Sequence, residues 1–202
     1  MHIPHRFWCY PPPVTQVQES GSRARTRQAI IDAAIDVLGR NPAAPLSEIS
    51  TAAEVGRTTL HRYFAERSDL MTAVSAEAVA RLSRATEQAR MAEGTGGAAV
   101  HRLCQEYFDL GGLLSLIFSE PGLLAGQWEG AGDCDPVFVA MVERGHRDGS
   151  IDPELPAAWV QSLIWSQLYA AWAYLAETGA SRHEVLRLVL RTVGGAVATK
   201  PA

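Results

Sequence analysis

The segment RTTLHRYF, residues 57–64, carries side chains that could bind the phosphates and bases of a nucleic acid. Leu60 and Phe64 lie four residues apart, so in a helix both would point to the same side, toward a core. The remaining surface would then carry two guanidinium groups, three hydroxyls and an imidazole, from Arg57, Thr58, Thr59, His61, Arg62 and Tyr63. Such groups hydrogen-bond to phosphate oxygens and to base edges. Nucleic-acid binding is therefore the first function to consider.

A second short helix directly before this segment would position it. Apolar residues recur there with the spacing of one helical face, at Leu46, Ile49, Ala52, Ala53 and Val55. Gly56 then breaks the chain. Two short helices joined at a glycine are the helix-turn-helix pattern, whose second helix lies in the major groove of DNA with its first residues nearest the bases. We expect Arg57 and Thr58 to be those residues, and a bidentate arginine–guanine contact is worth about 1–3 kcal/mol of discrimination.

Three arginines come before the first helix: Arg23, Arg25 and Arg27. We interpret them as a flexible arm that reaches an adjacent groove or phosphate. The helix that follows carries an apolar stripe at Ile30, Ala33, Ala34, Val37 and Leu38. It should end near residues 39–41, because Pro42 and Pro45 cannot continue it.

Residues 1–22 contain PPP and a polar run, and they show no helical period. We predict that they form a disordered arm. His2, His5 and Cys9 could be drawn as metal ligands, but the segment offers neither a fourth ligand nor a packed scaffold. We therefore predict no metal site. The segment also lacks an apolar core of signal-peptide length before its prolines.

The charge of the chain is unevenly distributed. The net charge is −4 at pH 7, of which residues 1–90 contribute +2 and residues 91–202 contribute −6. A basic front half and an acidic rear half suit binding to phosphate through one end only, although many proteins without such a role show a similar asymmetry. The three cysteines form no CxxC pair, which favours a reducing cytoplasm. The most apolar stretch, about 163–176, is too short to span a bilayer.

The rest of the chain is predicted to be helical. One helix is expected from about residue 68 to about residue 90, followed by a glycine-rich break, EGTGG at 93–97, as the candidate domain boundary. Further helices are expected over 98–119, 138–148, 157–177 and 183–197. The chain contains no alternating, β-branched runs bounded by turns. The predicted fold is therefore all-α.

Residues about 27–74 resemble the DNA-binding domain of the TetR (tetracycline-repressor) family of bacterial transcription regulators. The matching pieces are IIDAAIDVL, the I-x-x-A-A of ISTAAEV, the T-L-x-x-Y-F of TTLHRYF, and the basic residue and leucine of ERSDL. The resemblance implies an N-terminal three-helix helix-turn-helix domain, here 23–70, followed by a helical ligand-binding and dimerisation domain, here 71–202. The sequence departs from the family at Glu54, usually glycine, at Gly56, usually a capping serine, and at His61, usually aromatic.

The resemblance also implies a division of the contacts with DNA. Base contacts would come from Ser47, Arg57, Thr58 and His61. Phosphate contacts would come from Thr59, Arg62, Tyr63 and Arg67, in addition to the three arginines before the first helix. A solvated surface position is the ordinary alternative for any single arginine, and for His61 groove contact and plain surface exposure stay equally open.

The rear half is rich in aromatic and aliphatic residues and contains no GxSxG, HExxH or Walker motif, so we predict neither an enzyme nor a cofactor. These residues could simply form a core and a dimer interface. The resemblance implies that they enclose a small-molecule pocket, at Tyr107, Phe108, Phe118, Trp128, Met141, Trp165 and Tyr169. It also implies a homodimer through the last two helices, with close helix approach at Gly194, Gly195 and Ala196.

We therefore predict a cytoplasmic repressor that binds a near-palindromic double-stranded DNA operator and is released by a small apolar effector. Two alternatives stay open. A helical small-molecule-binding protein or enzyme without DNA binding would use the apolar bundle alone. An adaptor protein would use the exposed arginines to hold an acidic partner, and it would prefer no particular DNA sequence.

Overall fold

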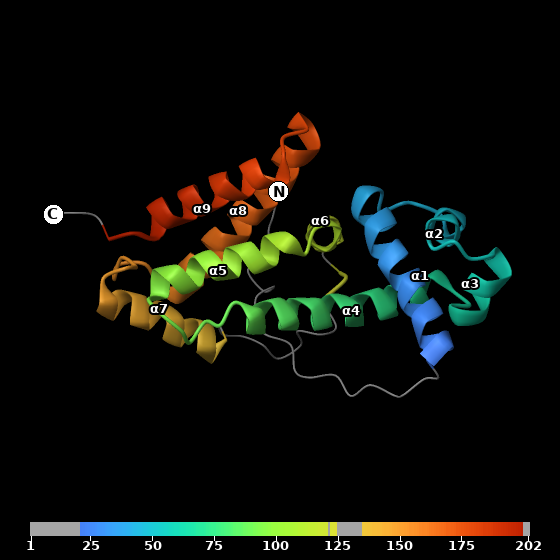
Figure 1. Ribbon diagram of the computed structural model, residues 1–202, viewed down its shortest axis with the longest axis horizontal. Coiled ribbons are helices and arrows are strands. Elements are labelled where there is room, and N and C mark those ends of the chain that lie inside the picture. Colours follow the sequence, from blue (N-terminus) through green and yellow to red (C-terminus); the bar gives the residue numbers. More distant parts are fainter. Residues whose placement is uncertain (1–20, 121, 125–134, 200–202) are drawn as a thin grey trace. The chain divides into compact units, whose positions relative to one another are not determined.

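The computed structural model describes residues 21–120, 122–124 and 135–199 (Figure 1). These residues are helical and contain no strand, so the all-α fold is confirmed over the part described. The helices are α1 (Gly21–Arg40), α2 (Leu46–Ala52), α3 (Arg57–Tyr63), α4 (Arg67–Gln88), α5 (Gly96–Asp109), α6 (Gly112–Ser119), α7 (Pro136–Asp148), α8 (Ala157–Thr178) and α9 (Arg182–Val197). None of them is long and apolar enough to cross a membrane.

The described residues divide into two compact units. The first unit contains residues 21–81 and the segment from 112 to 124, and therefore holds α1, α2, α3, most of α4 and α6. The second unit contains residues 82–111 and 135–199, and therefore holds the end of α4 together with α5, α7, α8 and α9. Helix α4 thus contributes residues to both units. The functional boundaries expected from the sequence, at 22/23 and 70/71, stay predictions.

Helix α1 forms the centre of the first unit, with buried residues along one side that include Ile30, Ile31, Ala34, Ile35 and Leu38. It ends at Arg40 before the prolines, as predicted. Its start differs from the prediction, because the helix begins at Gly21. The flexible arm expected at Arg23, Arg25 and Arg27 is therefore wrong: these residues lie in the first two turns of a helix.

Two short helices follow α1 as the helix-turn-helix pattern predicted. In the turn between them, the backbone N–H of Val55 donates to the carbonyl of Ser50 at 3.0 Å. Glu54 adopts a left-handed conformation with φ 54°. Residues other than glycine, asparagine and aspartate rarely adopt this conformation. The glycine that the resemblance places at this position would adopt the same turn without that penalty.

The single helix expected over 98–119 is two helices in the structure. The chain turns at Gly111, which has φ 63°, and α6 starts at Gly112. Helix α6 packs on α1, where a Cβ on Gly39 would lie 2.5 Å from the carbonyl oxygen of Gly112. The hydroxyl of Ser115 donates to the carbonyl of Gly39 at 2.7 Å. Gly111 therefore permits the break between the helices, and Gly39 permits the close approach of α1 to α6.

In the second unit, α5 packs against α7, α8 and α9. The ends of these helices follow local signals: Thr95 caps α5, Asp135 caps α7, and left-handed Gly149 and Gly179 end α7 and α8. The core of this unit includes large buried side chains from all four helices: Leu103, Phe108, Met141, Ile164, Leu168, Val189 and Val193. Residues 1–20, which are most of the disordered arm expected over 1–22 and include Cys9, lie outside the described residues, as do Trp128 and Cys134. The last two residues of that expected arm, Gly21 and Ser22, belong to α1, so the prediction of disorder is wrong for them.

Candidate nucleic-acid interface

Helix α3 separates its residues into a buried side and an exposed side. Leu60 and the following Phe64 are buried. The exposed residues are Arg57, Thr58, His61 and Arg62, and the half-buried ones are Thr59 and Tyr63. The residues expected to face bases and phosphates are thus accessible on one short helix, whose N-terminal residue is Arg57. Their contacts with DNA stay predictions.

Three of the expected phosphate contacts come together around one ring. The guanidinium carbon of Arg23, from α1, lies 6.0 Å from the centroid of the Tyr63 ring, and that of Arg62 lies 5.6 Å from it. Tyr63 with these two arginines is called the Tyr63 cluster below. Arg27 lies over the ring of Phe64 at 5.4 Å and Arg25 is exposed. The cluster joins the start of α1 to α3 and concentrates positive charge beside the exposed side of α3.

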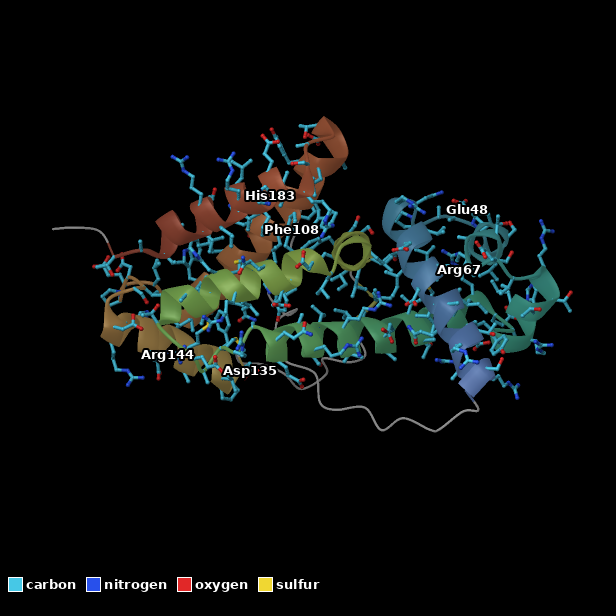
Figure 2. The ribbon with its side chains drawn as sticks, in the orientation of Figure 1. Glu48, Arg67, Phe108, Asp135, Arg144 and His183 are labelled. Carbon is cyan, nitrogen blue, oxygen red and sulfur yellow. The ribbon has the colours of Figure 1, made fainter. Side chains whose placement is uncertain are left out.

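Arg67, which is labelled in Figure 2, differs from the other expected phosphate contacts, because its guanidinium is bonded to the protein backbone. Its Nη1 donates to the carbonyl of Ala44 at 2.7 Å, and its Nη2 donates to the carbonyl of Pro42 at 2.8 Å. Both carbonyls belong to the loop between α1 and α2. Ser47, an expected base contact, is half-buried on α2, and its carbonyl accepts bonds from Ser50 and Thr51.

A charged cluster that the sequence analysis missed joins α1 to α4 within the first unit. Arg81 donates to Glu77 at 2.8 Å and to Asp32, which also accepts a bond from Gln28 at 3.0 Å. Partial burial opposes the charge on Arg81, but the hydrogen bond and charge of Glu77 and the charge of Asp32 raise its pKa. The spacing of Glu77 and Arg81 could have indicated their pair. No local spacing indicates Asp32, which lies 49 positions from Arg81.

Two aromatic pairs occupy the second unit, and they include three of the seven predicted pocket residues. Tyr107 and Trp165 lie 5.0 Å apart between ring centroids, and the Tyr107 hydroxyl shares a 2.8 Å hydrogen bond with Thr86. Phe108 stacks with Trp172 at 5.5 Å. Trp172 was not among the predicted pocket residues, and its buried Nε1 has no hydrogen-bond partner among the residues described.

The other predicted pocket residues are distributed differently. Met141 is fully buried, whereas Tyr169 is exposed. Phe118 belongs to the first unit, and Trp128 lies outside the described residues. The roles of all seven in binding a ligand stay predictions.

Arg182, the first residue of α9, covers the Phe108–Trp172 pair. Its guanidinium carbon lies 5.1 Å from the centroid of Phe108 and 5.0 Å from that of Trp172. It also donates to the carbonyl of Phe108 at 3.2 Å and lies 3.6 Å from a carboxylate oxygen of Asp109. These contacts hold the start of α9 against the end of α5, beside the Phe108–Trp172 pair.

The outer surfaces of α8 and α9 carry exposed apolar side chains: Trp159, Tyr169, Tyr174 and Leu188. Gly195 also lies open, with nothing of the chain within 4 Å of a Cβ placed on it. A Cβ on Gly194 would lie 2.6 Å from Nε2 of His101 on α5, and the place of this glycine in a dimer interface stays a prediction. Gly194 therefore serves packing inside the second unit, while Leu188 and Gly195 face outward.

Neither a metal centre nor a reactive thiol is indicated in the part of the chain that the structure describes. It contains no group of three or more histidine, cysteine or acidic side chains that could hold a metal ion. Burial raises the pKa of the Cys104 thiol to about 12, so the thiolate that would act as a nucleophile is suppressed at neutral pH.

No protein-family model matches the chain. The HTH-type transcriptional repressor LfrR of Mycolicibacterium smegmatis is 36% identical to it over 183 residues, which are 91% of this chain and 96% of LfrR. Crystal structures of the TetR-like transcriptional regulator LfrR, alone and in complex with proflavine, are 32% identical to this chain, with TM-scores of 0.65 and 0.68. Each comparison covers 89% of this chain and 100% of the LfrR chain.

The fold also resembles that of a more distant regulator. The ketosteroid transcriptional regulator KstR2 of Mycobacterium tuberculosis matches with a TM-score of 0.66 at 14% identity, over 91% of this chain and 98% of that one. At that identity the likeness concerns the fold alone.

Proposed function

This chain belongs to the TetR family of transcriptional regulators, and we propose that it is a homodimeric DNA-binding repressor released from its operator by a small aromatic ligand. The observation that carries the proposal is the exposed side of α3, which presents Arg57, Thr58, His61 and Arg62 above a buried Leu60 and Phe64. A helix with this distribution fits the major groove, where base edges present distinguishable donors and acceptors.

The proposed DNA contacts follow from where these side chains lie. Arg57 and Thr58 begin α3 and would meet base edges, together with His61 one turn later and Ser47 on α2. The Tyr63 cluster, Thr59 and the neighbouring Arg25 and Arg27 would bind phosphates on either side of the groove. The cation–π contacts of Arg23 and Arg62 with Tyr63 restrict both guanidinium groups before DNA arrives, which lowers the entropy lost on binding.

A two-fold dimer would present two copies of α3 to successive major grooves, about 34–36 Å apart along the duplex. We propose that α8 and α9 form the interface. Exposed Leu188 and open Gly195 on α9, with Trp159 and Tyr174 on α8, support this assignment, because large exposed apolar surfaces mark protein interfaces. A near-palindromic operator follows from the symmetry of such a dimer.

The proposed effector would bind in the second unit beside its aromatic pairs. LfrR has been solved with proflavine, a planar aromatic molecule. The second unit of this chain supplies aromatic rings in two pairs, Tyr107 with Trp165 and Phe108 with Trp172. Stacking on such rings favours planar aromatic ligands. No catalytic role is proposed for these residues.

The proposed mechanism couples the two units through α4, which contributes residues to both. A ligand that binds the second unit better in one orientation of α4 would favour that orientation. It could shift the equilibrium only by the difference between its affinities for the two states. If the favoured orientation spoils the spacing of the two recognition helices, the operator is released.

Selection of bound fragments from random DNA tests the proposal. Recovery of a near-palindromic sequence, bound with an affinity that falls steeply with salt, is the expected result. The double variant Arg57→Ala with Tyr63→Ala should then lose that binding. Proflavine serves as the first effector probe and should weaken binding to the recovered site. Wild-type DNA affinity in the double variant, or an affinity insensitive to salt, would refute the proposed interface on α3, and failure to recover any sequence would favour a helical binding protein without DNA function.

A further inference from the structure

We infer that Arg67 serves DNA binding as a positioning residue, which fixes the entry of the helix-turn-helix to the start of α4, and that it is not a phosphate contact. The inference rests on the DNA-binding function proposed above. It assigns to this arginine a different role from that of the Tyr63 cluster, although both lie in the first unit and both carry positive charge.

The geometry of the guanidinium carries the argument. Arg67 is the first residue of α4, and its two terminal nitrogens donate to two carbonyls of one loop, Ala44 at 2.7 Å and Pro42 at 2.8 Å. These carbonyls lie 23 and 25 positions earlier in the chain. The planar fork of arginine suits two acceptors held side by side, a geometry that lysine cannot reproduce.

The loop that Arg67 holds determines where α2 begins. Residues 41–45 join α1 to α2, and Ala44 is completely buried. Within the loop, the backbone N–H of Ala44 donates to the carbonyl of Asn41 at 2.9 Å. Pro45 follows as the N-cap of α2 and makes no side-chain capping bond. The direction in which α2 leaves the loop therefore depends on backbone contacts. Two of them are the hydrogen bonds that the carbonyls of Pro42 and Ala44 accept from Arg67.

Arg62 is the comparison for Arg67 within the first unit, because it is an exposed arginine that we propose to contact phosphate. Its side chain is exposed, and its guanidinium carbon lies over the ring of Tyr63 at 5.6 Å from the centroid. Arg67 is half-buried, and its two terminal nitrogens already donate to two carbonyls of one loop, which fixes the orientation of the guanidinium. Turning the guanidinium toward a phosphate would break both bonds and release the loop before α2.

The dependence of affinity on salt separates the two roles, because each phosphate contact contributes about 0.9 to the slope of log affinity against log salt. Binding to the selected operator should be measured for wild type, Arg67→Met, Arg67→Lys, Arg62→Met and Arg147→Met. Arg147 is an exposed arginine of α7 in the second unit and serves as the control for loss of charge.

Both Arg67 variants should weaken binding by about tenfold or more at every salt concentration while keeping the wild-type slope. Arg62→Met should reduce the slope by about 0.9, and Arg147→Met should change neither quantity. Wild-type affinity in Arg67→Lys, combined with a reduced slope in Arg67→Met, would overturn the inference and make Arg67 a phosphate contact. Unchanged affinity in both Arg67 variants would overturn it as well.

A measurement without DNA distinguishes failure of the inference from failure of the proposed function. The N–H of Ala44 donates to the carbonyl of Asn41, and the N–H of Glu48 donates to the carbonyl of Pro45. Both amides should exchange their hydrogens faster in Arg67→Met and Arg67→Lys, but not in Arg62→Met. If wild type selects no DNA sequence, the proposed function fails while this exchange still shows whether Arg67 holds the loop. Wild-type exchange at both amides in the Arg67 variants would refute the tether itself.

Discussion

Arg144 of α7 donates from Nε to the carbonyl of Gly94 at 2.8 Å, and thereby joins α7 to the turn that ends α4. Its Nη2 donates to the carbonyl of Met91 in the same turn. From α5, Arg102 donates to Ala89, Arg90 and Glu93 at 2.7–2.9 Å. Two guanidinium groups thus satisfy five backbone carbonyls of one turn, in which Ala89 and Met91 are buried.

The start of α5 is fixed to α7 at the same place. Gly96 donates its N–H to a carboxylate oxygen of Asp148 at 2.9 Å, and Gly97 donates to the hydroxyl of Ser150 at 2.8 Å. A Cβ on Gly96 would lie 2.4 Å from the Cα of Gly145, so no larger residue fits there. The turn at residues 89–94 that follows α4, the start of α5 and the end of α7 are therefore joined by hydrogen bonds at one place, called the joint below.

Arg144→Met should lower the free energy of unfolding by about 1–3 kcal/mol, since it removes hydrogen bonds from a charged donor and leaves two carbonyls short of partners. Arg147→Met is the matched control, because Arg147 lies on the same helix and, among the residues described, donates to the carbonyl of Glu143 in that helix and to no other. It should change stability by less than about 0.5 kcal/mol. Urea denaturation measures both values, and equal losses in the two variants would contradict a special role for the joint.

Asp148 should make the joint sensitive to acid. Hydrogen bonds from Ser150 and from the N–H of Gly96, together with the charge of Arg144, lower the pKa of Asp148 below its usual value. A carboxylate with a depressed pKa in the folded state stabilises the protein above its unfolded pKa of about 3.9, and this contribution is lost as the pH falls through the folded value. Stability should therefore decline below about pH 4. Asp148→Asn, followed by urea denaturation from neutral to acidic pH, should show a shallower decline; an identical pH profile would contradict this assignment.

Glu54→Gly should stabilise the first unit by about 0.5–1 kcal/mol, because glycine adopts φ 54° without the steric cost that a Cβ imposes. Glu54→Ala removes the same carboxylate but keeps the Cβ, so it should bring no such gain. Thermal or urea unfolding of the two variants separates backbone strain from the loss of a negative charge. Equal stabilisation in both would show that charge, and not conformation, sets the cost at this turn.

Leu188→Arg should weaken the proposed dimer, because it places a charge at an apolar position of α9 that is 41% exposed in the single chain. Val137→Arg on α7 is the matched control, since Val137 is 51% exposed but lies on a helix outside the proposed interface. Sedimentation velocity at micromolar concentration should show dissociation in the first variant only. Operator affinity should fall in parallel, and a stable dimer in Leu188→Arg would exclude α9 from the interface.

The recognition helix and its surroundings could be predicted from the sequence because the signals there are local. Leu60 and Phe64 lie four residues apart, and that spacing alone places them on one side of a helix and the arginines on the other. Pro42, Gly149 and Gly179 end their helices through their own backbone preferences. The family resemblance rests on the same short segments, and the relationship to LfrR bears it out.

Packing of distant segments decided what these local patterns could not. Local patterns were enough to predict an all-α chain with a helix-turn-helix, because helix starts, stops and buried sides depend on neighbours within four or five residues. Only the tertiary structure gave Arg67 the carbonyls of Pro42 and Ala44, paired Arg81 with Asp32, and brought Arg102 and Arg144 to one turn. A guanidinium can reach any carbonyl or carboxylate that folding brings near, so its role follows from long-range packing and not from its position in the chain.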